Sequence, residues 1–469
     1  MKRNLFVLPS VSNPGCFLEM IATRGVRGRG KADQGILERD REIQIQLTGT
    51  RKQIDTLTKL GEKAPAGSLE TAQAELRRLS AEYESFVKDV KLKNSELASL
   101  LTVEVPDIEQ IQKQLDRGAT LVEYFTGKDR TYVWLVTRDQ ITVKELPLKE
   151  KDLSERVSAV MALNISNQSR KRGTVMVRVP EGEKEITDAQ REENRRRFSD
   201  EMKALYRDLV APVVDEVKTE KLIVVPHGPL HKVPFSALHD GTGYLVDRYS
   251  ISVLPSLSVI PHVIAKRNQD KGTLLALANP KTELPALGFA EGEVKSISED
   301  FDRKSIHFKE QATEERARRE ASTPDVIHFA CHGEFNDRQP LQSGLLLASE
   351  GQEDGRLQVH EIFSLDLRGA NLVALSACET GLGKITSGDD MVGLSRAFLY
   401  AGTPSLMATL WQVDDLSTSR LMKHFYSRWR KDALPKPEAL RQAQKAIKAT
   451  RGFEHPFYWA AFELIGDWQ

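Results

Sequence analysis

Two short segments decide the fold: DVIHFACHG at residues 325–333 and NLVALSACETG at residues 371–381. Each is an apolar run that stops at a reactive side chain, His332 in the first and Cys378 in the second, with a glycine close behind. Open parallel sheets carry their chemistry at the carboxyl ends of their strands. If both runs are such strands, His332 and Cys378 project from one edge of the sheet, where a thiol and an imidazole make a cysteine nucleophile with its base.

The sequence around these segments predicts a parallel α/β sheet with helices on both faces. From residue 221 onward, short apolar runs alternate with stretches of helical periodicity. Parallel strands joined by helices have this order. The expected strands are 222–225, 274–278, the runs ending at His332 and at Cys378, and 405–411. The expected helices are 289–298, 390–401, 416–432 and 437–450. A hairpin of 345–348 with 357–359 and a short helix at 360–364 fit between His332 and Cys378.

Two further regions precede this sheet. Residues 36–104 are rich in Glu, Gln, Lys, Arg and Leu with apolar residues at helical spacing, which predicts a helical hairpin that turns near Pro65. After Pro106, aromatic and β-branched runs predict strands at 120–125, 131–136 and 140–143, followed by helices at 150–163 and 186–218. The 469 residues therefore divide into an irregular segment with the hairpin (1–105), a first α/β lobe (106–265) and a second α/β lobe (266–469).

The composition excludes several classes of protein. The formal net charge is +0, from 67 basic and 67 acidic residues, which argues against binding nucleic acid or a membrane surface through the whole chain. Three cysteines, an odd and small number, fit a reducing compartment. The apolar run before Pro9 is too short for a secretion signal, and no run approaches the roughly 18 residues of a membrane span. We expect a cytoplasmic protein.

The motifs around His332 and Cys378 resemble those of the CHAT family, a caspase-like branch of the clan CD cysteine peptidases that is related to separases and often attached to tetratricopeptide repeats. The resemblance covers about residues 106–469. One departure is the missing repeat array ahead of the hairpin, which suggests that repeats were lost or are supplied by a partner. The matching segments are 224–231, 233–238, 326–333, 375–383, 392–404, 410–415 and 457–468.

The resemblance implies a catalytic Cys–His dyad in the second lobe and an inactive caspase-like first lobe without such a pair. Cys378 would attack the scissile carbonyl as a thiolate, and His332 would orient it and protonate the leaving amine. The backbone N–H groups of Gly333 and Cys378 would form the oxyanion hole. No third residue that would complete a catalytic triad is identifiable, and no metal or cofactor is expected.

The substrate pocket is less defined by the sequence. Asp389 and Asp390 open one expected helix, and Asp414 opens the next one, after Trp411. Aspartates at helix starts are ordinarily caps. The alternative is that these residues line the pocket for the residue before the cut and select Arg or Lys. The short segment 379–389, with three glycines, predicts control by ordering of this loop without obligatory cleavage within it.

Other reactive residues have structural interpretations. Cys331 turns to the face opposite His332, His328 is expected to be a buried strand histidine, and His227 and His231 flank Pro229 in a turn without cysteine or carboxylate partners for zinc.

The predicted function is a regulated cysteine endopeptidase that acts on a protein or peptide. A catalytically silent CHAT scaffold and a cysteine acyltransferase remain as alternatives. A regulatory or repeat-containing partner would dock on the N-terminal helices; no nucleic acid or membrane is expected.

Overall fold

The computed structural model describes most of the chain beyond residue 106: 107–166, 187–267, 271–334, 343–351, 353–376, 389–411 and 413–469. It also describes residue 67, the helix that follows it, and isolated positions between 39 and 65. One compact unit contains residues 106–469 and the other contains residues 11–105. Within these described ranges, no helix is both long enough and apolar enough to cross a membrane.

The unit of residues 11–105 contains the long helix α3 (Ser68–Lys93), as the periodicity predicts. Ala72 and Leu79 are buried along one face of this helix. Ile43, from the earlier part of the unit, packs in a small cluster with Leu79, with Leu76 and Phe86 at its margin. Two segments of this unit therefore share an apolar seam, as in a helical hairpin.

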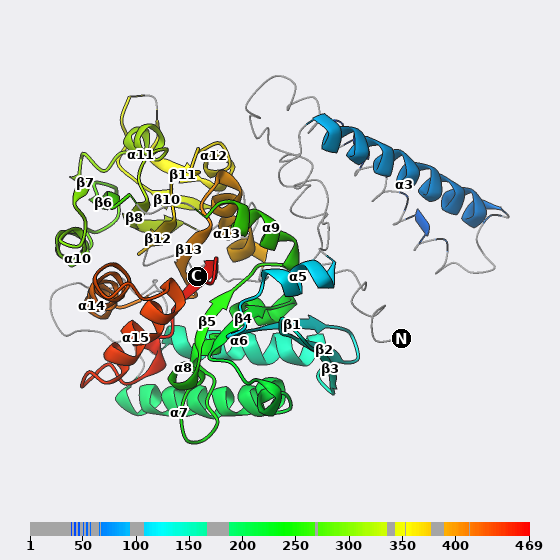
Figure 1. Cartoon of the computed structure of the whole chain (residues 1–469), viewed down its shortest axis with the longest axis horizontal. Helices are drawn as coiled ribbons and strands as arrows, with labels where there is room; N and C mark the ends of the chain where they lie inside the picture. The colour runs from blue at the N-terminus through cyan, green and yellow to red at the C-terminus, as the bar shows by residue number, and fades with distance from the viewer. Residues whose placement is uncertain are drawn as a thin grey trace. The chain divides into compact units, whose positions relative to one another are not determined.

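The unit of residues 106–469 is built on an eleven-stranded sheet in the order β3-β2-β1-β4-β5-β14-β13-β12-β8-β6-β7 (Figure 1). The predicted parallel core is confirmed, because β7, β6, β8, β12 and β13 all pair in parallel. The strands are β1 (Ala119–Thr126), β2 (Thr131–Val136), β3 (Ile141–Leu146), β4 (Lys221–Val225), β5 (Ser250–Val253), β6 (Thr273–Pro280), β7 (Arg303–Lys309), β8 (Val326–Ala330), β12 (Leu372–Leu375), β13 (Ser405–Thr409) and β14 (Phe462–Gly466).

The sheet has two halves that run in opposite directions. Strand β14 pairs antiparallel with β13 but parallel with β5, and β5, β4 and β1 continue in parallel. Strands β2 and β3 add an antiparallel meander at the edge. The carboxyl ends of β8 and β12 consequently lie at the edge of the sheet opposite the carboxyl end of β4.

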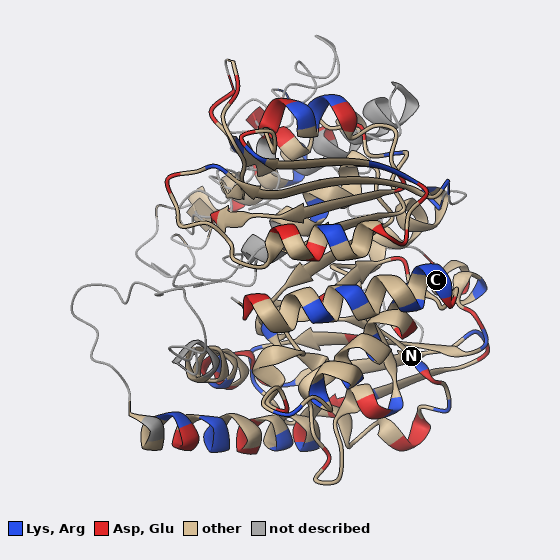
Figure 2. Ribbon diagram, turned by 90° about the vertical axis from the view of Figure 1, so that its left-hand side faces the viewer, with Lys and Arg blue, Asp and Glu red and all other residues tan. Residues whose placement is uncertain are grey.

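Helices cover both faces of the sheet, as predicted. Along β1, Val122 and Tyr124 belong to the core under α6, α7, α10, α14 and α15, while Ala119 and Leu121 belong to a second core under α5 and α9. In Figure 2 the ribbon segments of Lys, Arg, Asp and Glu lie mainly on the helices and loops, and the strands between the helical layers are largely tan. The helices are α5 (Ile108–Gln114), α6 (Glu150–Ser166), α7 (Asp188–Leu205), α8 (Leu245–Arg248), α9 (Ile260–Ala265), α10 (Ala290–Ser298), α11 (Glu314–Glu320), α12 (Val359–Ile362), α13 (Asp389–Ala401), α14 (Asp415–Tyr426) and α15 (Lys436–Lys448).

A separate three-stranded antiparallel sheet lies between β8 and β12 in the chain, with the order β11-β10-β9. It consists of β9 (His332–Glu334), β10 (Gly344–Leu346) and β11 (Arg356–Gln358), and α12 follows directly. The predicted hairpin and short helix are therefore confirmed. The predicted strand ending at His332 is corrected: β8 ends at Ala330, and His332 begins the small sheet.

Candidate catalytic site

The backbone of His332 is fixed by two pieces of structure. It lies two residues after the end of β8, a strand buried at every position, and it starts β9, where it pairs with Leu346 while Gly333 pairs with Leu345. The residue is therefore held at the point where the chain leaves the large sheet and enters the small one. A side chain in such a place has a defined direction without depending on a long loop.

The imidazole of His332 is 9% exposed and makes one hydrogen bond. Its Nε2 lies 2.8 Å from the carbonyl oxygen of Pro285, in the segment after β6. A carbonyl only accepts, so Nε2 carries the proton, and Nδ1 of the neutral ring keeps its lone pair. Nδ1 is buried and has no hydrogen-bond partner in the described part of the chain. Among the described residues, the hydrogen bond to Pro285 therefore leaves Nδ1 as an acceptor without a donor.

Pro285 is a site residue that the sequence analysis missed. It contributes only a backbone oxygen, and any residue type offers one. No motif in the sequence marks it, because the contact depends on how the segment after β6 passes the end of β8. This carbonyl orients the His332 ring, a contact for which the sequence identified no residue.

Cys378 lies outside the described residues, and the structure describes the chain that leads to it. Strand β12 pairs in parallel with β8, with Leu375 opposite Phe329. Ser376 donates its backbone N–H to the carbonyl oxygen of Phe329 over 2.8 Å. The two strands that lead to Cys378 and His332 are thus immediate neighbours that end at the same edge of the sheet.

A groove of about 850 Å³ opens beside His332. Gly333 and Glu334 of β9 line one part of it, and residues 281–284 in the segment after β6 line another. A volume of this size accommodates several residues of an extended peptide. The remaining lining comes from Glu310 and from 346–349 and 354–356.

Residues 199–467 match the family model of the CHAT domain. The chain belongs to the CHAT domain family. It is similar to tetratricopeptide repeat protein 28 of Mus musculus, with 27% identity over 331 residues, 57% of this chain and 13% of that protein. The Homo sapiens protein of the same name is 26% identical over 327 residues, with the same two coverages. The chain thus spans a small part of the length of these relatives.

Among solved structures, the CHAT chain resembles the Saccharomyces cerevisiae separase–securin complex, with a TM-score of 0.51 and 12% identity over 85% of this chain and 34% of that one. A second crystal structure of that complex gives a TM-score of 0.50. These likenesses show the fold, and together with the family match they confirm the expected caspase-like α/β architecture.

The four residues that were expected to line the substrate pocket have different surroundings in this CHAT domain. Asp389 and Asp390 begin α13, and their side chains lie outside what the structure describes. Asp414 caps α14, where its Oδ1 accepts from the Ser417 N–H over 2.9 Å. Trp411 is 1% exposed, and its Nε1 donates to the Phe457 carbonyl oxygen. The Trp411 side chain is a core residue, so its expected contact with substrate is not supported by this packing.

The other cysteine and histidine residues near the sheet are buried. Burial raises the pKa of the free Cys331 thiol far above its ordinary value, so this thiol stays protonated. His328 is fully buried, with Nε2 2.8 Å from Glu293 Oε1 and Nδ1 3.1 Å from the Tyr426 hydroxyl. These contacts agree with the structural roles expected from the sequence.

The two histidines after β4 lie at the opposite edge of the sheet from His332. Nδ1 of His227 accepts a hydrogen bond from the Thr126 hydroxyl, with the two atoms 2.8 Å apart. Burial, and then the nearby charges of Arg396 and His227, lower the pKa of His231 to about 3, so its ring is neutral at pH 7. Neither arrangement is a metal site.

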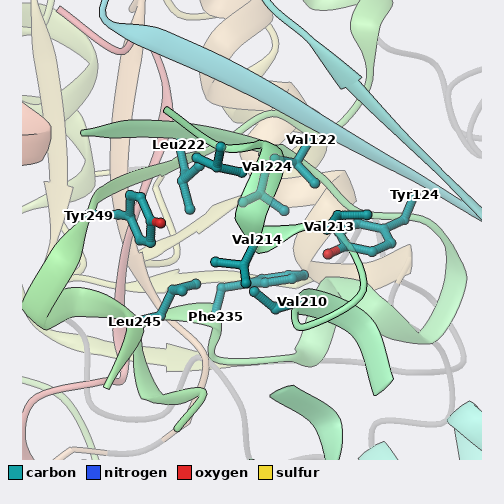
Figure 3. A pocket seen from close by; sticks show the side chains of 11 residues that line it. Val122, Tyr124, Val210, Val213, Val214, Leu222, Val224, Phe235, Leu245 and Tyr249 are labelled. Carbon is teal, nitrogen blue, oxygen red and sulfur yellow. The ribbon is translucent and has the colours of Figure 1, made fainter. Parts of the chain in front are cut away.

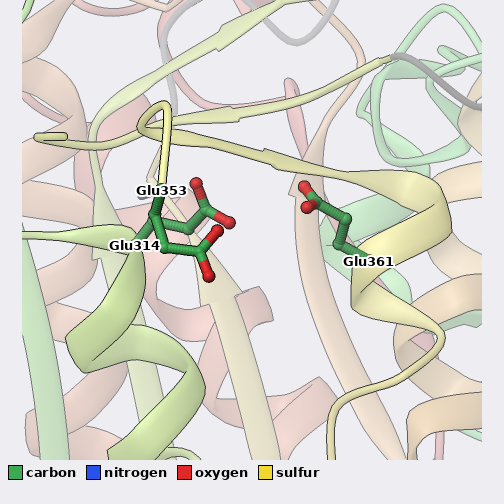
Figure 4. A group of neighbouring side chains, drawn as sticks. All are labelled: Glu314, Glu353 and Glu361. Atoms are coloured by element: carbon green, nitrogen blue, oxygen red, sulfur yellow. The ribbon is translucent and has the colours of Figure 1, made fainter. Parts of the chain in front are cut away.

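Three carboxylates converge below the small sheet, from Glu314, Glu353 and Glu361 (Figure 4). Their spacing could suit a metal ion, but the cation among them is the Arg318 guanidinium. Arg318 lies 2.9 Å from Glu314, 3.9 Å from Glu353, and in contact with Glu361. The cluster is therefore an ion-pair network that joins α11, α12 and the β10–β11 hairpin.

A small apolar cavity lies under β1 and β4 in the first half of the sheet (Figure 3). Its walls include Val122, Tyr124, Val224, Phe235 and Tyr249. Its volume is about 20 Å³, little more than the space for one water molecule. We interpret it as imperfect packing of the core.

Proposed function

We propose that this CHAT domain is a cysteine endopeptidase with Cys378 as nucleophile and His332 as base and acid. The observation that carries the proposal is the state of His332: Nε2–H is bound to the Pro285 carbonyl, and the buried Nδ1 has no partner among the described residues. A buried acceptor left unused costs free energy in an ordinary core. The thiol of Cys378, which follows strand β12 in the sequence, is the partner that would offset this cost.

The proposed reaction uses Cys378 and His332 in the following steps. The Cys378 thiol transfers its proton to Nδ1, and the thiolate attacks the scissile carbonyl carbon. The negative charge that develops on the carbonyl oxygen is stabilised by the backbone N–H groups of Gly333 and Cys378. Nδ1–H then protonates the leaving amine as the C–N bond breaks, which leaves a thioester on Cys378. Water, activated by the neutral imidazole, hydrolyses the thioester and regenerates the thiol.

The Pro285 carbonyl has two roles in this scheme. It holds the ring in the orientation that directs Nδ1 toward the reacting atoms. It also accepts a hydrogen bond from the imidazolium that forms after proton transfer, which stabilises the positive charge. The half of the sheet from residues 106–265 contains no cysteine, so we assign it a non-catalytic role.

The first experiment compares the wild-type protein with Cys378→Ala and His332→Ala on a peptide library, with new amino termini read by mass spectrometry. We expect each variant to lose at least about 10²-fold in cleavage rate. An active-site thiol probe should label the wild type but not Cys378→Ala. The matched control is Cys331→Ala, which removes the buried thiol and should keep both cleavage and labelling.

The alternatives give different results in the same experiment. Acyl transfer without new amino termini would indicate an acyltransferase. A wild-type protein that neither cleaves peptides nor reacts with the probe would contradict the peptidase proposal. The catalytically silent scaffold would then be the remaining interpretation.

A further inference from the structure

The groove beside His332 has walls of different origin. One wall is the segment after β6, with Lys281, Glu283 and Leu284. The second wall is the small sheet, with Glu334 of β9 and Arg356 of β11, and the turn before β11 adds Asp354. The first wall continues directly into Pro285, which orients His332, and the second begins at His332 itself. The groove lining therefore includes the residues that adjoin Pro285 and His332 in the chain, namely Leu284 and Gly333.

The groove carries an excess of negative charge. Its lining has four acidic residues against two basic ones, Lys281 and Arg356, which gives 2 − 4 = −2. Lys281 pairs with Glu310 at 3.3 Å, and Arg356 pairs with Glu334. The carboxylates of Glu283 and Asp354 are exposed, and neither has an ion-pair partner in the described part of the chain. Clefts lined by one sign of charge attract the opposite one.

An exposed apolar side chain lies next to these carboxylates. Leu284 is 38% exposed, and in the described part of the chain the other large apolar residues exposed to this degree are Ile141 and Phe289. Leu284 immediately precedes Pro285 and lines the groove. An apolar side chain of a bound peptide could bury its surface here, which stabilises binding by about 25 cal/mol per Å² removed from water.

The chemistry of His332 assigns the groove to one side of the scissile bond. The imidazole protonates the leaving amine, so the segment that departs with that amine must pass His332. From His332 the chain runs through Gly333 and Glu334 into the groove. A four-residue extended segment is about 13 Å long, which a groove of this volume accommodates.

We propose that this groove binds the substrate residues that follow the scissile bond and selects segments with Lys or Arg beside an apolar residue. The inference rests on the proposed function and deepens it by naming the substrate class. Cations pair with Glu283 and Asp354, and the apolar residue packs on Leu284.

The test uses two peptide series that are identical before the cut and carry either Lys or Glu at the second and third positions after it. Binding is measured by fluorescence anisotropy on full-length Cys378→Ala protein, and cleavage on the wild type. We expect the Lys series to bind and to be cleaved at least about 5-fold better at low salt, with the preference shrinking at 0.5 M salt because exposed charges are screened.

Charge reversal gives the matched comparison. Glu283→Lys should reduce or invert the preference for the Lys series. It should also improve binding and cleavage of the Glu series, because the new positive charge attracts the Glu side chains of the peptide. Glu299→Lys, which makes the same change at an exposed residue outside the groove lining, should leave the preference as in the wild type. Leu284→Ser should weaken both series alike when their apolar residue is retained.

The two proposals fail in distinguishable ways. If Cys378-dependent cleavage occurs but the two series bind and react equally at low salt, the groove inference is wrong and the peptidase stands. If the Cys378→Ala protein binds the two series with a preference that Glu299→Lys abolishes and Glu283→Lys leaves intact, the groove inference is also wrong. If no cleavage depends on Cys378 while the Glu283-dependent binding preference persists, the peptidase is wrong and the cation-selective groove is supported.

Discussion

Glu123 is a carboxylic acid in the interior of the sheet. It lies on β1 opposite Trp134 of β2 and Val225 of β4, and it is 9% exposed. Burial raises the pKa of this carboxyl to about 8. At neutral pH the group is therefore largely protonated, which avoids the cost of an unpaired charge in the core.

This raised pKa predicts a pH-dependent stability. The folded pKa of about 8 exceeds the ordinary value of 4.5, so the stabilising contribution is fully present below about pH 4.5 and is lost as the pH rises through 8. Glu123→Gln removes the titration but keeps the shape. As the pH is raised from 4 to 9, we expect the free energy of unfolding of the variant to increase by roughly 3–5 kcal/mol relative to that of the wild type. Urea unfolding at several pH values measures this difference.

An exposed carboxyl provides the control for this prediction. Glu109→Gln, at an exposed position on α5, should change the free energy of unfolding by no more than about 0.5 kcal/mol. Parallel pH curves for the wild type and Glu123→Gln would show that the Glu123 carboxyl is paired or solvated in solution.

At the scale of single residues, the sequence predicted side chains better than backbone contacts. Cys331 was expected to be a structural thiol, and it is fully buried between the end of β8 and the start of β9. The Pro285 carbonyl had no signal in the sequence, because a backbone oxygen is common to all residues. Trp411 was expected to line the substrate pocket, but its ring is packed in the core, where a large aromatic side chain contributes most through burial.

Between elements, the network around Arg318 connects the small sheet to the helices beneath it. Glu314 is fully buried; one carboxylate oxygen pairs with Arg318, and the other accepts the Gly355 N–H over 3.1 Å. Burial, and then the charge of Glu361, raise the pKa of Glu314 to about 7 despite the opposing effect of Arg318. Gly355 precedes β11 and lines the groove, so this network supports one groove wall.

Arg318→Gln should destabilise this part of the protein. Removing the guanidinium leaves Glu314 and Glu361 facing each other without a cation. Loss of one partner of a buried pair costs about 3–5 kcal/mol, and we expect the lower end of this range because Arg318 is 28% exposed. The loss should increase with pH between 6 and 8 as Glu314 ionises. Thermal unfolding, with hydrogen exchange at residues 353–358, measures both effects.

Arg319→Gln is the matched control. Arg319 is 55% exposed and pairs with Glu315 and Glu320 on the surface, where ion pairs contribute less than about 1 kcal/mol. Equal destabilisation by the two variants would show that the buried network has no special role in holding the hairpin.

The elements that the sequence missed share a property. Strand β7 is a sheet edge with charged residues at its exposed positions, so its apolar alternation is weak. Strand β14 contains Glu463, a half-buried carboxyl whose pKa burial raises to about 8. Strand β5 has only four residues, two of them serines. In each case tertiary pairing determines the strand, and local composition does not reveal it.

For the whole molecule, the two halves of the sheet meet at β14. The sequence predicted a parallel sheet in the second lobe but gave no indication that an antiparallel strand from the end of the chain would join it to the strands of 106–265. That junction brings together segments that are far apart in the sequence, and no local pattern encodes such a pairing. One continuous sheet, with one apolar core on its larger helical face, runs through both regions.

Gly466 is the residue on which this junction depends most. It ends β14 with φ +105°, and it pairs with Ser405 at the start of β13. A Cβ at this position would lie 2.2 Å from the Pro404 carbonyl oxygen and 3.1 Å from Leu399 Cδ2. The Pro404 carbonyl also accepts the Asp467 N–H, over 2.9 Å. The close approach of the two backbones therefore requires glycine both for its conformation and for its size.

Gly466→Ala should lower the free energy of unfolding by at least about 3 kcal/mol, because it combines an unfavourable φ with a backbone clash. Gly452→Ala separates the two causes: Gly452 has φ +90°, but a Cβ there meets no atom within 4 Å, so its cost should be near 1 kcal/mol. Calorimetry of both variants measures the difference. Equal costs would mean that the β13–β14 junction relaxes around a methyl group, and the two halves of the sheet would then be less rigidly joined than their pairing indicates.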